Sequence, residues 1–419
     1  MRVVLRGVLP LVVALALAAC GESDPPAGQP LAPSGELAVL AHPGDDLLFL
    51  APAIDDAVAA RAGLTVVYVT TGDDDGDHDP LADLDARAAG VRAAYAALAG
   101  ASASDWSCGW ISIAGHAAEH CRLAAAELSL VLLGYPDGHH DGAATGSLLQ
   151  LWEDHVTRVT TEGARTAVYD RPGLIATLAA VIDATAPATL RTLEVAATHG
   201  ADHSDHMMVG ALAVLAAAAA QSSPQLIAYR GDNIASEPTN AAPATLPRSL
   251  DALARYTACT RGCAPCGDAC AADQLDATQR AWIARSYPIE IRTSGDGQLR
   301  LADRCVVAPA SAGVNPVLTS CAGATTWQLG DDGTLVADTG LCLDVLVLTG
   351  EVVTSACDAT GVGGRLFFDA EGHVWSGVPP APASDMALAH LYCLRDAGGR
   401  PRAGLCGAAS APVWQLAAP

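Results

Sequence analysis

The sequence predicts an α/β fold with a parallel sheet between two helical layers, followed by a second domain that is entirely β. From Glu36 onward, apolar strand-like segments alternate with longer helical patterns. Past Arg292 the helical periodicity ends, and short strands, turns rich in Gly and Asp, and scattered cysteines follow. There, a pair of cysteines followed by a tryptophan recurs three times at about forty residues, which indicates a pseudo-symmetric all-β module. We therefore expect two folded domains, residues 36–292 and residues 297–419.

The alternating segments of the first domain are expected to supply its sheet and helices. Apolar strands separated by helices indicate a parallel sheet covered on both faces, a three-layer Rossmann-like arrangement. In such sheets, ligands collect beyond the carboxyl ends of the strands. The segments run over Leu37 to Ala41, Leu64 to Thr71, a helical stretch from Leu81 to Leu98, Leu128 to Leu133, Leu174 to Ala184, Leu190 to Ala196, a helix from His206 to Ala220, and Gln225 to Tyr229.

The first twenty residues read as an export signal. Arg2 and Arg6 precede an apolar run that is too short to span a bilayer and ends at Cys20. Leu17-Ala18-Ala19-Cys20 resembles a bacterial lipobox, which implies cleavage before Cys20 and a lipid anchor on it; a signal peptide cut elsewhere is the alternative. Residues 21–35 are rich in Pro, Gly and Ser, as expected of a flexible tether. Because Gly21 is not the aspartate associated with inner-membrane retention, an outer-membrane location at the periplasmic or cell surface is favoured.

The cysteines can pair without remainder once Cys20 carries lipid. Of 13 cysteines, eight fall into close pairs, which are Cys108 with Cys121, Cys305 with Cys321, Cys342 with Cys357, and Cys393 with Cys406. The other four, Cys259, Cys263, Cys266 and Cys270, crowd into one segment that could form two disulfides or bind zinc. After export we favour disulfides, since this cysteine usage suits an oxidising compartment.

The charge of the chain excludes one class of partner. The formal net charge is −23, spread along the sequence, which argues against binding nucleic acid or an anionic surface.

Metal-ligand residue types follow two of the predicted strands. His42 and Asp45 lie in a turn directly after the first strand, and His206 begins a helix shortly after the strand from Leu190. Two histidines, one carboxylate and an open position are the ligand set of a hydrolytic zinc, because zinc lowers the pKa of a bound water to about 7. Solvated turns are the alternative, but two such segments at strand ends favour a metal.

These segments closely resemble the PIG-L, or LmbE-like, family of zinc-dependent de-N-acetylases. The family's first motif, AHPDDE or AHPDDD, is similar to residues 41–46, and its HxDH motif matches His203-Ser204-Asp205-His206. The similarity continues through residues 67–73, 133–138 and 229–231 and covers roughly Glu36 to Tyr287. It implies that His42, Asp45 and His206 bind zinc. It further implies that His203 stabilises the oxyanion or protonates the leaving amine, that Asp205 orients His203, and that the substrate carries N-acetylglucosamine.

One position departs from the family pattern. The family places its general base, an aspartate, directly after His-Pro, where this chain has Gly44. General-base assistance typically contributes about 10²- to 10⁴-fold, so its loss would weaken turnover. Shifting the alignment by one residue would make Asp45 the base and Asp46 a ligand, but the following residues do not support the insertion this needs. Asp205 or an acid among residues 73–79 could also substitute.

Three other polar segments near these motifs have simpler interpretations. The acidic residues 73–79 lack the glutamate that closes an EF-hand calcium loop and are expected to form a solvated rim. His139 and His140 are expected to be adjacent surface histidines. His199 lies near the predicted metal, where it could act behind the ligands.

The C-terminal domain resembles the ricin-B-like β-trefoil, whose lobes carry a CLD and a QxW motif. Only the lobe with Cys342-Leu343-Asp344 keeps the aspartate that binds sugar hydroxyls, whereas Val307 and Arg395 occupy the equivalent places. Tryptophans such as Trp327 and Trp414 are expected in the core. The resemblance therefore implies at most one weak carbohydrate site, at Asp344, or a purely structural or targeting role.

The sequence thus supports a leading hypothesis and two others. The first is an exported lipoprotein that uses Zn²⁺ to hydrolyse the N-acetyl group of an amino sugar or glycan. The second is a catalytically weakened zinc- and carbohydrate-binding protein, which Gly44 makes a serious rival. The third, a disulfide-rich scaffold, leaves the metal motif without a role.

Overall fold

The computed structural model describes residues 27–72, 80–195, 198–346, 348–358, 364–377, 391–406 and 412–418. Cys20 with the predicted signal peptide, residues 21–26 of the predicted tether and the acidic residues 73–79 lie outside these ranges. None of the helices in the described ranges is both long and apolar enough to cross a membrane.

Five parallel strands form the centre of the molecule, as the sequence predicts. In spatial order they are β9 (Gln225–Tyr229), β8 (Thr189–Leu193), β1 (Glu36–Leu40), β2 (Leu64–Thr70) and β5 (Leu128–Tyr135). Every residue of β2 and β5 is buried, because helices cover both faces of the sheet. The carboxyl ends of all five strands therefore meet at one edge.

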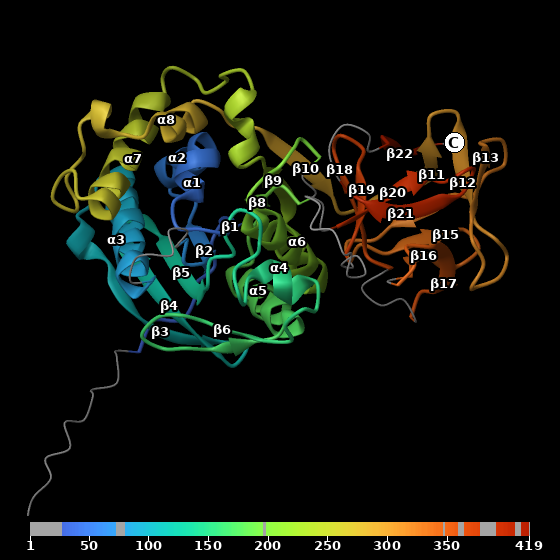
Figure 1. Ribbon diagram of the computed structural model, residues 1–419, viewed down its shortest axis with the longest axis horizontal. Coiled ribbons are helices and arrows are strands. Elements are labelled where there is room, and N and C mark those ends of the chain that lie inside the picture. Colours follow the sequence, from blue (N-terminus) through green and yellow to red (C-terminus); the bar gives the residue numbers. More distant parts are fainter. Residues whose placement is uncertain are drawn as a thin grey trace, which may run out of the picture.

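Two groups of helices form the outer layers (Figure 1). One group packs around α3 and consists of α1 (Asp45–Phe49), α2 (Ala51–Ala60), α3 (Pro80–Ala99), α7 (Leu246–Arg261) and α8 (Ala277–Ile283). The other packs around α6 and consists of α4 (Leu148–Trp152), α5 (Arg171–Thr185) and α6 (Ser204–Ala219). Helix α6 contacts β8 and β1 and is buried from Ser204 to Ala216, which agrees with a sequence that is apolar around the whole helix.

Antiparallel strands extend the sheet at both edges, so the sheet is mixed. On one side, the hairpin of β3 (Ser107–Ile113) and β4 (His116–Leu123) pairs with β5, and a disulfide joins the register partners Cys108 and Cys121. On the other side, β10 (Pro288–Arg292) pairs with β9. A separate two-stranded ribbon consists of β6 (Val159–Thr160) and β7 (Val168–Tyr169).

The chain after β10 is all-β in its described residues, and its strands divide between the central sheet and a separate sheet. Strand β10 pairs with β18, and through it the central sheet continues to twelve strands. The continuing strands are β18 (Leu366–Asp369), β19 (Val374–Ser376), β20 (Tyr392–Asp396) and β21 (Pro401–Leu405). An eight-stranded sheet holds β11 (Gly295–Leu301), β12 (Arg304–Val307), β13 (Val317–Ser320), β14 (Trp327–Leu329), β15 (Leu335–Ala337), β16 (Leu341–Val345), β17 (Val352–Ala356) and β22 (Trp414–Ala417).

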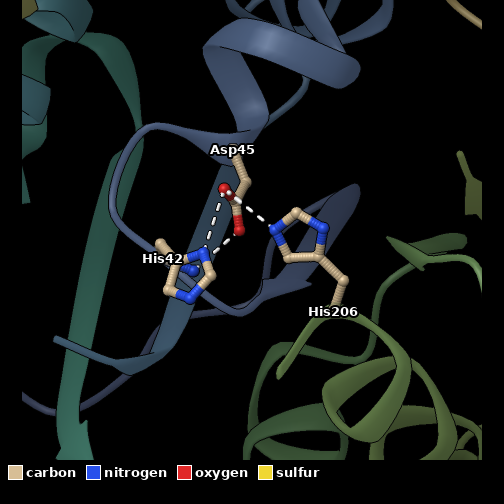
Figure 2. A group of neighbouring side chains, drawn as sticks. All are labelled: His42, Asp45 and His206. Carbon is tan, nitrogen blue, oxygen red and sulfur yellow. Dashed lines mark hydrogen bonds and ion pairs between the residues drawn. The ribbon is translucent and has the colours of Figure 1, made fainter. Parts of the chain in front are cut away.

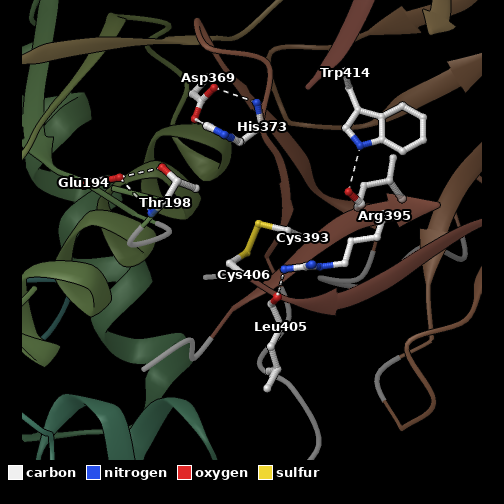
Figure 3. Close-up of a disulfide and its surroundings, with 10 residues drawn as sticks. Glu194, Thr198, Asp369, His373, Cys393, Arg395, Leu405, Cys406 and Trp414 are labelled. Carbon is white, nitrogen blue, oxygen red and sulfur yellow. Dashed lines mark hydrogen bonds and ion pairs between the residues drawn. A yellow bond between two sulfur atoms is a disulfide. The ribbon is translucent and has the colours of Figure 1, made fainter. Parts of the chain in front are cut away.

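The threefold pattern of the C-terminal region is only partly visible in its packing. The indole of Trp327 donates to the carbonyl of Val306. That of Trp414 donates to the carbonyl of Leu394 (Figure 3). Each acceptor directly follows the first cysteine of a pair. The middle tryptophan, Trp375, instead packs against Phe367 in the large core of the α/β region. The β-trefoil therefore stays a prediction.

Six disulfides link the described cysteines. They join Cys108–Cys121, Cys259–Cys266, Cys263–Cys270, Cys305–Cys321, Cys342–Cys357 and Cys393–Cys406. The crowded segment after α7 thus forms two disulfides rather than a zinc site. This number of disulfides is typical of proteins that work outside the cytoplasm.

Candidate metal centre

The first two predicted ligands lie in the turn that follows β1. The backbone amide of His42 donates to Oδ2 of Asp45 over 2.7 Å, and the amide of Asp45 returns a bond to the carbonyl of His42. These two bonds fix the turn from which α1 begins. Both side chains consequently face the edge where the parallel strands end.

The third predicted ligand comes from the first turn of α6. His206 is 2% exposed, and its Nε2 lies 3.5 Å from Oδ1 of Asp45, while Nδ1 of His42 lies 3.4 Å from the same oxygen. Figure 2 shows the three side chains converging, although two of them are far from the third in sequence. Ligands at about 2.1 Å from a tetrahedral zinc are separated by about 3.3 Å, so these distances fit such an ion.

Two further carboxylates hold the imidazoles in place. Oδ2 of Asp137 lies 3.1 Å from Nε2 of His42, and Oδ1 of Asp202 lies 2.9 Å from Nδ1 of His206. In each case the other ring nitrogen remains free to face Asp45. A carboxylate behind a ligating histidine fixes its tautomer and raises its basicity, which is the usual arrangement at zinc sites.

The charges of the site favour a cation. Burial lowers the pKa of His42, but the carboxylates of Asp45, Asp137 and Asp205 outweigh it and raise this pKa well above its ordinary value. Burial also opposes ionisation of Asp45, yet His42 and His206 hold its pKa far below its usual range. Four buried aspartates surround two imidazoles here, and a divalent ion can replace the protons that these imidazoles otherwise carry.

His203 lies beside the ligands, and one hydrogen bond shows which of its ring nitrogens carries the proton in the neutral form. Its Nδ1 accepts the backbone amide of Asp205, so the neutral ring carries its proton on Nε2. Burial, followed by the charges of His42 and His206, lowers the pKa of His203 to about 2. The ring is therefore a neutral hydrogen-bond donor at physiological pH.

The carboxylate of Asp205 does not make the contact that the family resemblance implies. Its Oδ2 accepts the amide of Gly138 over 2.9 Å and lies 3.5 Å from Nε2 of His42. It is the backbone of Asp205, not the side chain, that bonds to His203. The helix geometry explains this, because His203 is the N-cap of α6 and its ring caps the first turn.

Asp46 is turned away from the metal position. The hydroxyls of Tyr68 and Tyr95 both donate to its Oδ2 from the protein core, and burial raises the pKa of Asp46 to about 6. The shifted alignment, which would make Asp46 a ligand, is therefore wrong. Gly44 stands at the family's base position with φ 115°, a conformation that favours glycine.

A cavity of about 250 Å³ opens onto the ligands. Arg87, Tyr256 and Trp282 line it, together with Asp232, which lies near His206. Sequence reasoning assigned no role to these residues or to Asp137 and Asp202. A signal was available for the last two, since Asp137 lies two residues after the end of β5 and Asp202 directly precedes the matched HxDH residues.

The remaining histidines of these segments lie outside the metal centre. His139 and His140 are exposed, as expected, and their carbonyls accept the hydroxyl and amide of Ser204. His199 is bound between Glu194 and Glu371, with nitrogen–oxygen distances of 2.7 and 2.8 Å. It therefore joins the α/β region to the C-terminal strands instead of supporting a ligand.

Asp344, the predicted sugar-binding residue, lies on β16. Its Oδ2 accepts the hydroxyl of Ser355 over 3.1 Å, and partial burial raises the pKa of Asp344.

The family comparison agrees with the position of this centre. Residues 37–217 match the family model described as GlcNAc-PI de-N-acetylase, PIG-L. This range holds all three predicted ligands and His203. No curated protein matches the chain.

Three solved structures show distant similarity to the chain. GalB, the 4-carboxy-2-hydroxymuconate hydratase from Pseudomonas putida, is 15% identical with a TM-score of 0.33, covering 54% of this chain and 78% of that one. The conserved protein TT1542 from Thermus thermophilus is 17% identical with a TM-score of 0.30, covering 53% and 78%. The zinc-inhibited form of teicoplanin deacetylase Orf2 is 15% identical with a TM-score of 0.31, covering 53% and 83%. These similarities are too distant to indicate what the chain does.

Proposed function

Because residues 37–217 form a PIG-L family domain, we propose that this chain is a zinc-dependent de-N-acetylase acting on a substrate that contains N-acetylglucosamine. The observation that carries the proposal is the convergence of His42, Asp45 and His206 at separations suited to one tetrahedral ion.

The residues around the cavity have separate roles in this proposal. Zinc, when bound by these three residues, supplies a Lewis acid for the acetamide carbonyl and lowers the pKa of water to about 7. Asp137 and Asp202 keep the two imidazoles oriented. In this proposal the Nε2–H of His203 hydrogen-bonds to the substrate oxygen as negative charge develops on it. The proton taken from the water then passes to the amine as the C–N bond breaks, which leaves acetate and a free amine.

Asp137 is the best-placed acceptor for the proton of the attacking water. Asp137 lines the cavity, and its Oδ1 lies 3.8 Å from Nε2 of His203 while its Oδ2 stays beside Nε2 of His42. Gly44 offers no carboxylate, and Asp205 is engaged by Gly138. Catalysis through Asp137 is expected to be slower than in a relative that has both carboxylates.

A second candidate function follows from the same glycine. Without the family's base, the chain would bind zinc and an acetylated sugar with little turnover. Asp344 is the proposed carbohydrate-binding residue of the C-terminal region. Loss of N-acetylglucosamine binding in Asp344→Asn, measured by calorimetry, would support this site, and unchanged binding would exclude it.

The export features complete the proposal. We propose that Cys20 carries the lipid that anchors the chain at the outer membrane, which would place the cavity near envelope or surface glycans. Mass spectrometry of the membrane-extracted protein should show a diacylated Cys20, and an unmodified or differently cleaved N-terminus would contradict this.

The function can be tested on protein that lacks residues 1–20. We expect one equivalent of zinc and release of acetate from N-acetylglucosamine glycosides. His206→Ala should lose both, whereas His155→Ala, which alters an exposed histidine outside the site, should keep both. Zinc without acetate release would favour the binding protein, and no zinc at all would refute the proposal.

A further inference from the structure

A tyrosine from a distant helix fills the space beside the metal turn. Tyr256 of α7 is 4% exposed and lies between two glycines. A Cβ added to Gly44 would lie 2.9 Å from Cζ of Tyr256, and a Cβ added to Gly90 on α3 would lie 2.7 Å from its Cδ2. Neither neighbour can therefore carry a side chain while the ring is in place.

The hydroxyl of the same tyrosine is bound to the metal turn. It donates to the carbonyl of Pro43 over 2.6 Å and accepts a bond from Nη1 of Arg87 over 3.2 Å. The carbonyl of Pro43 belongs to the peptide bond that leads into Gly44. The hydrogen bond thus holds this peptide in the orientation that gives Gly44 its positive φ.

The helix that carries Tyr256 is itself restrained. Helix α7 ends at Arg261, and the disulfide Cys259–Cys266 joins its last turn to the segment that follows, which Cys263–Cys270 cross-links further. The amide of Cys270 also donates to the carbonyl of Ala254. The ring consequently cannot leave the turn without disturbing a cross-linked element.

We propose that the ring of Tyr256 occupies the space that a general base at residue 44 would need. Gly44, Gly90 and Tyr256 then form one packed unit. This inference rests on the proposed function, because residue 44 is a general-base position only in a de-N-acetylase. Tyr256 acts here as a positioning residue in two ways, because it excludes a carboxylate from residue 44 and braces the turn that carries His42 and Asp45. A single Gly44→Asp substitution should therefore fail to restore the base.

The activity test compares Gly44→Asp in three backgrounds, each loaded with zinc. Hydrolysis of p-nitrophenyl acetate, a generic substrate of zinc sites, is measured together with acetate release from N-acetylglucosamine glycosides. We expect Gly44→Asp to give no increase in rate when residue 256 is Tyr or in the Tyr256→Phe background, where the ring still fills the space. With Tyr256→Ala we expect a gain on the order of 10²-fold over Tyr256→Ala alone. A comparable gain from Gly44→Asp by itself would overturn the proposal.

A second measurement tests the packed unit without any activity or metal. The decrease in Tm caused by Gly44→Ala should be smaller by at least about 2 °C in the Tyr256→Ala background, because the clash is removed while the backbone strain remains. Equal decreases in both backgrounds would show that the ring does not exclude a side chain at residue 44. A chain without zinc would contradict the proposed function, yet this coupling would still be expected.

Discussion

The α/β region and the C-terminal β region use their buried residues differently. In the first, buried Asp and His side chains gather at one edge of a parallel sheet and face each other across a cavity. In the second, the buried residues are mainly apolar, and Trp327 and Trp414 bond to nearby carbonyls. A cluster of buried charges lowers stability unless the charges are paired or bind an ion, so it points to a functional site. A core of tryptophans and disulfides contributes to stability and needs no ligand. The comparison locates the chemistry in the α/β region.

The two regions nevertheless meet at a junction that combines strand pairing, the apolar packing of Phe367 and Trp375, and polar contacts. Strand β10 pairs with β18, and the amide of Ala370 donates to the carbonyl of Glu290. Glu194 bonds to Thr198 on the α/β side and Asp369 bonds to His373 on the other side (Figure 3). His199 links the two sides, because it binds both Glu194 and Glu371. Glu194 also accepts the amide of Thr198, at the start of the described segment that leads to His203.

The largest expected effect is the loss of a core tryptophan. Trp414→Ala should lower the free energy of unfolding by about 3–5 kcal/mol, because it removes a buried indole and leaves a cavity. Trp414 belongs to the C-terminal core and not to the core around the metal centre, so the zinc content should stay at one equivalent. Urea unfolding and metal analysis check both results. Loss of zinc in this variant would show that the two regions fold as a single unit.

A substitution of the residue behind a zinc ligand should instead affect zinc affinity more than stability. Asp202→Asn removes the carboxylate that orients His206, and zinc affinity should fall by about 10- to 100-fold. Stability without zinc should fall less than in Trp414→Ala, because the substitution removes only the charge of Asp202 and the amide keeps an oxygen that can accept the ring N–H. Competition with a chromophoric chelator measures the affinity. Asn233→Ala serves as the control, because it alters a nearby polar residue whose side chain bonds to Arg230 and Glu194. Unchanged affinity in Asp202→Asn would mean that Asp202 does not support the ligand.

The sequence predicted the parallel sheet and its ligand edge because both depend on local patterns. Apolar strands separated by helices specify the sheet, and His42, Asp45 and His206 stand next to strand or helix ends. The packing around Tyr256 was not predictable, since Gly90 and Tyr256 meet only when α3 packs on α7. The pairing of β10 with β18 was missed for a related reason. Both strands are short, and only the register of the folded sheet brings Ile291 opposite Asp369.

The smallest expected effect is a pH dependence at the junction between the regions. The hydrogen bond to Glu194, together with the charges of Glu194 and Glu371, raises the pKa of His199, although burial and the charge of Arg230 oppose the shift. A raised histidine pKa contributes stability that is complete below the unfolded value of about 6.5 and is lost as the pH rises through the folded value. His199→Gln should therefore lose stability relative to the parent at pH 5.5 and little at pH 9. The difference should stay below about 1 kcal/mol, because Glu371 is 44% exposed and solvent screens its charge. Urea unfolding at both pH values measures it, with His155→Gln as a control on the surface. If the difference grew with rising pH, the imidazolium would not be the species that joins the two regions.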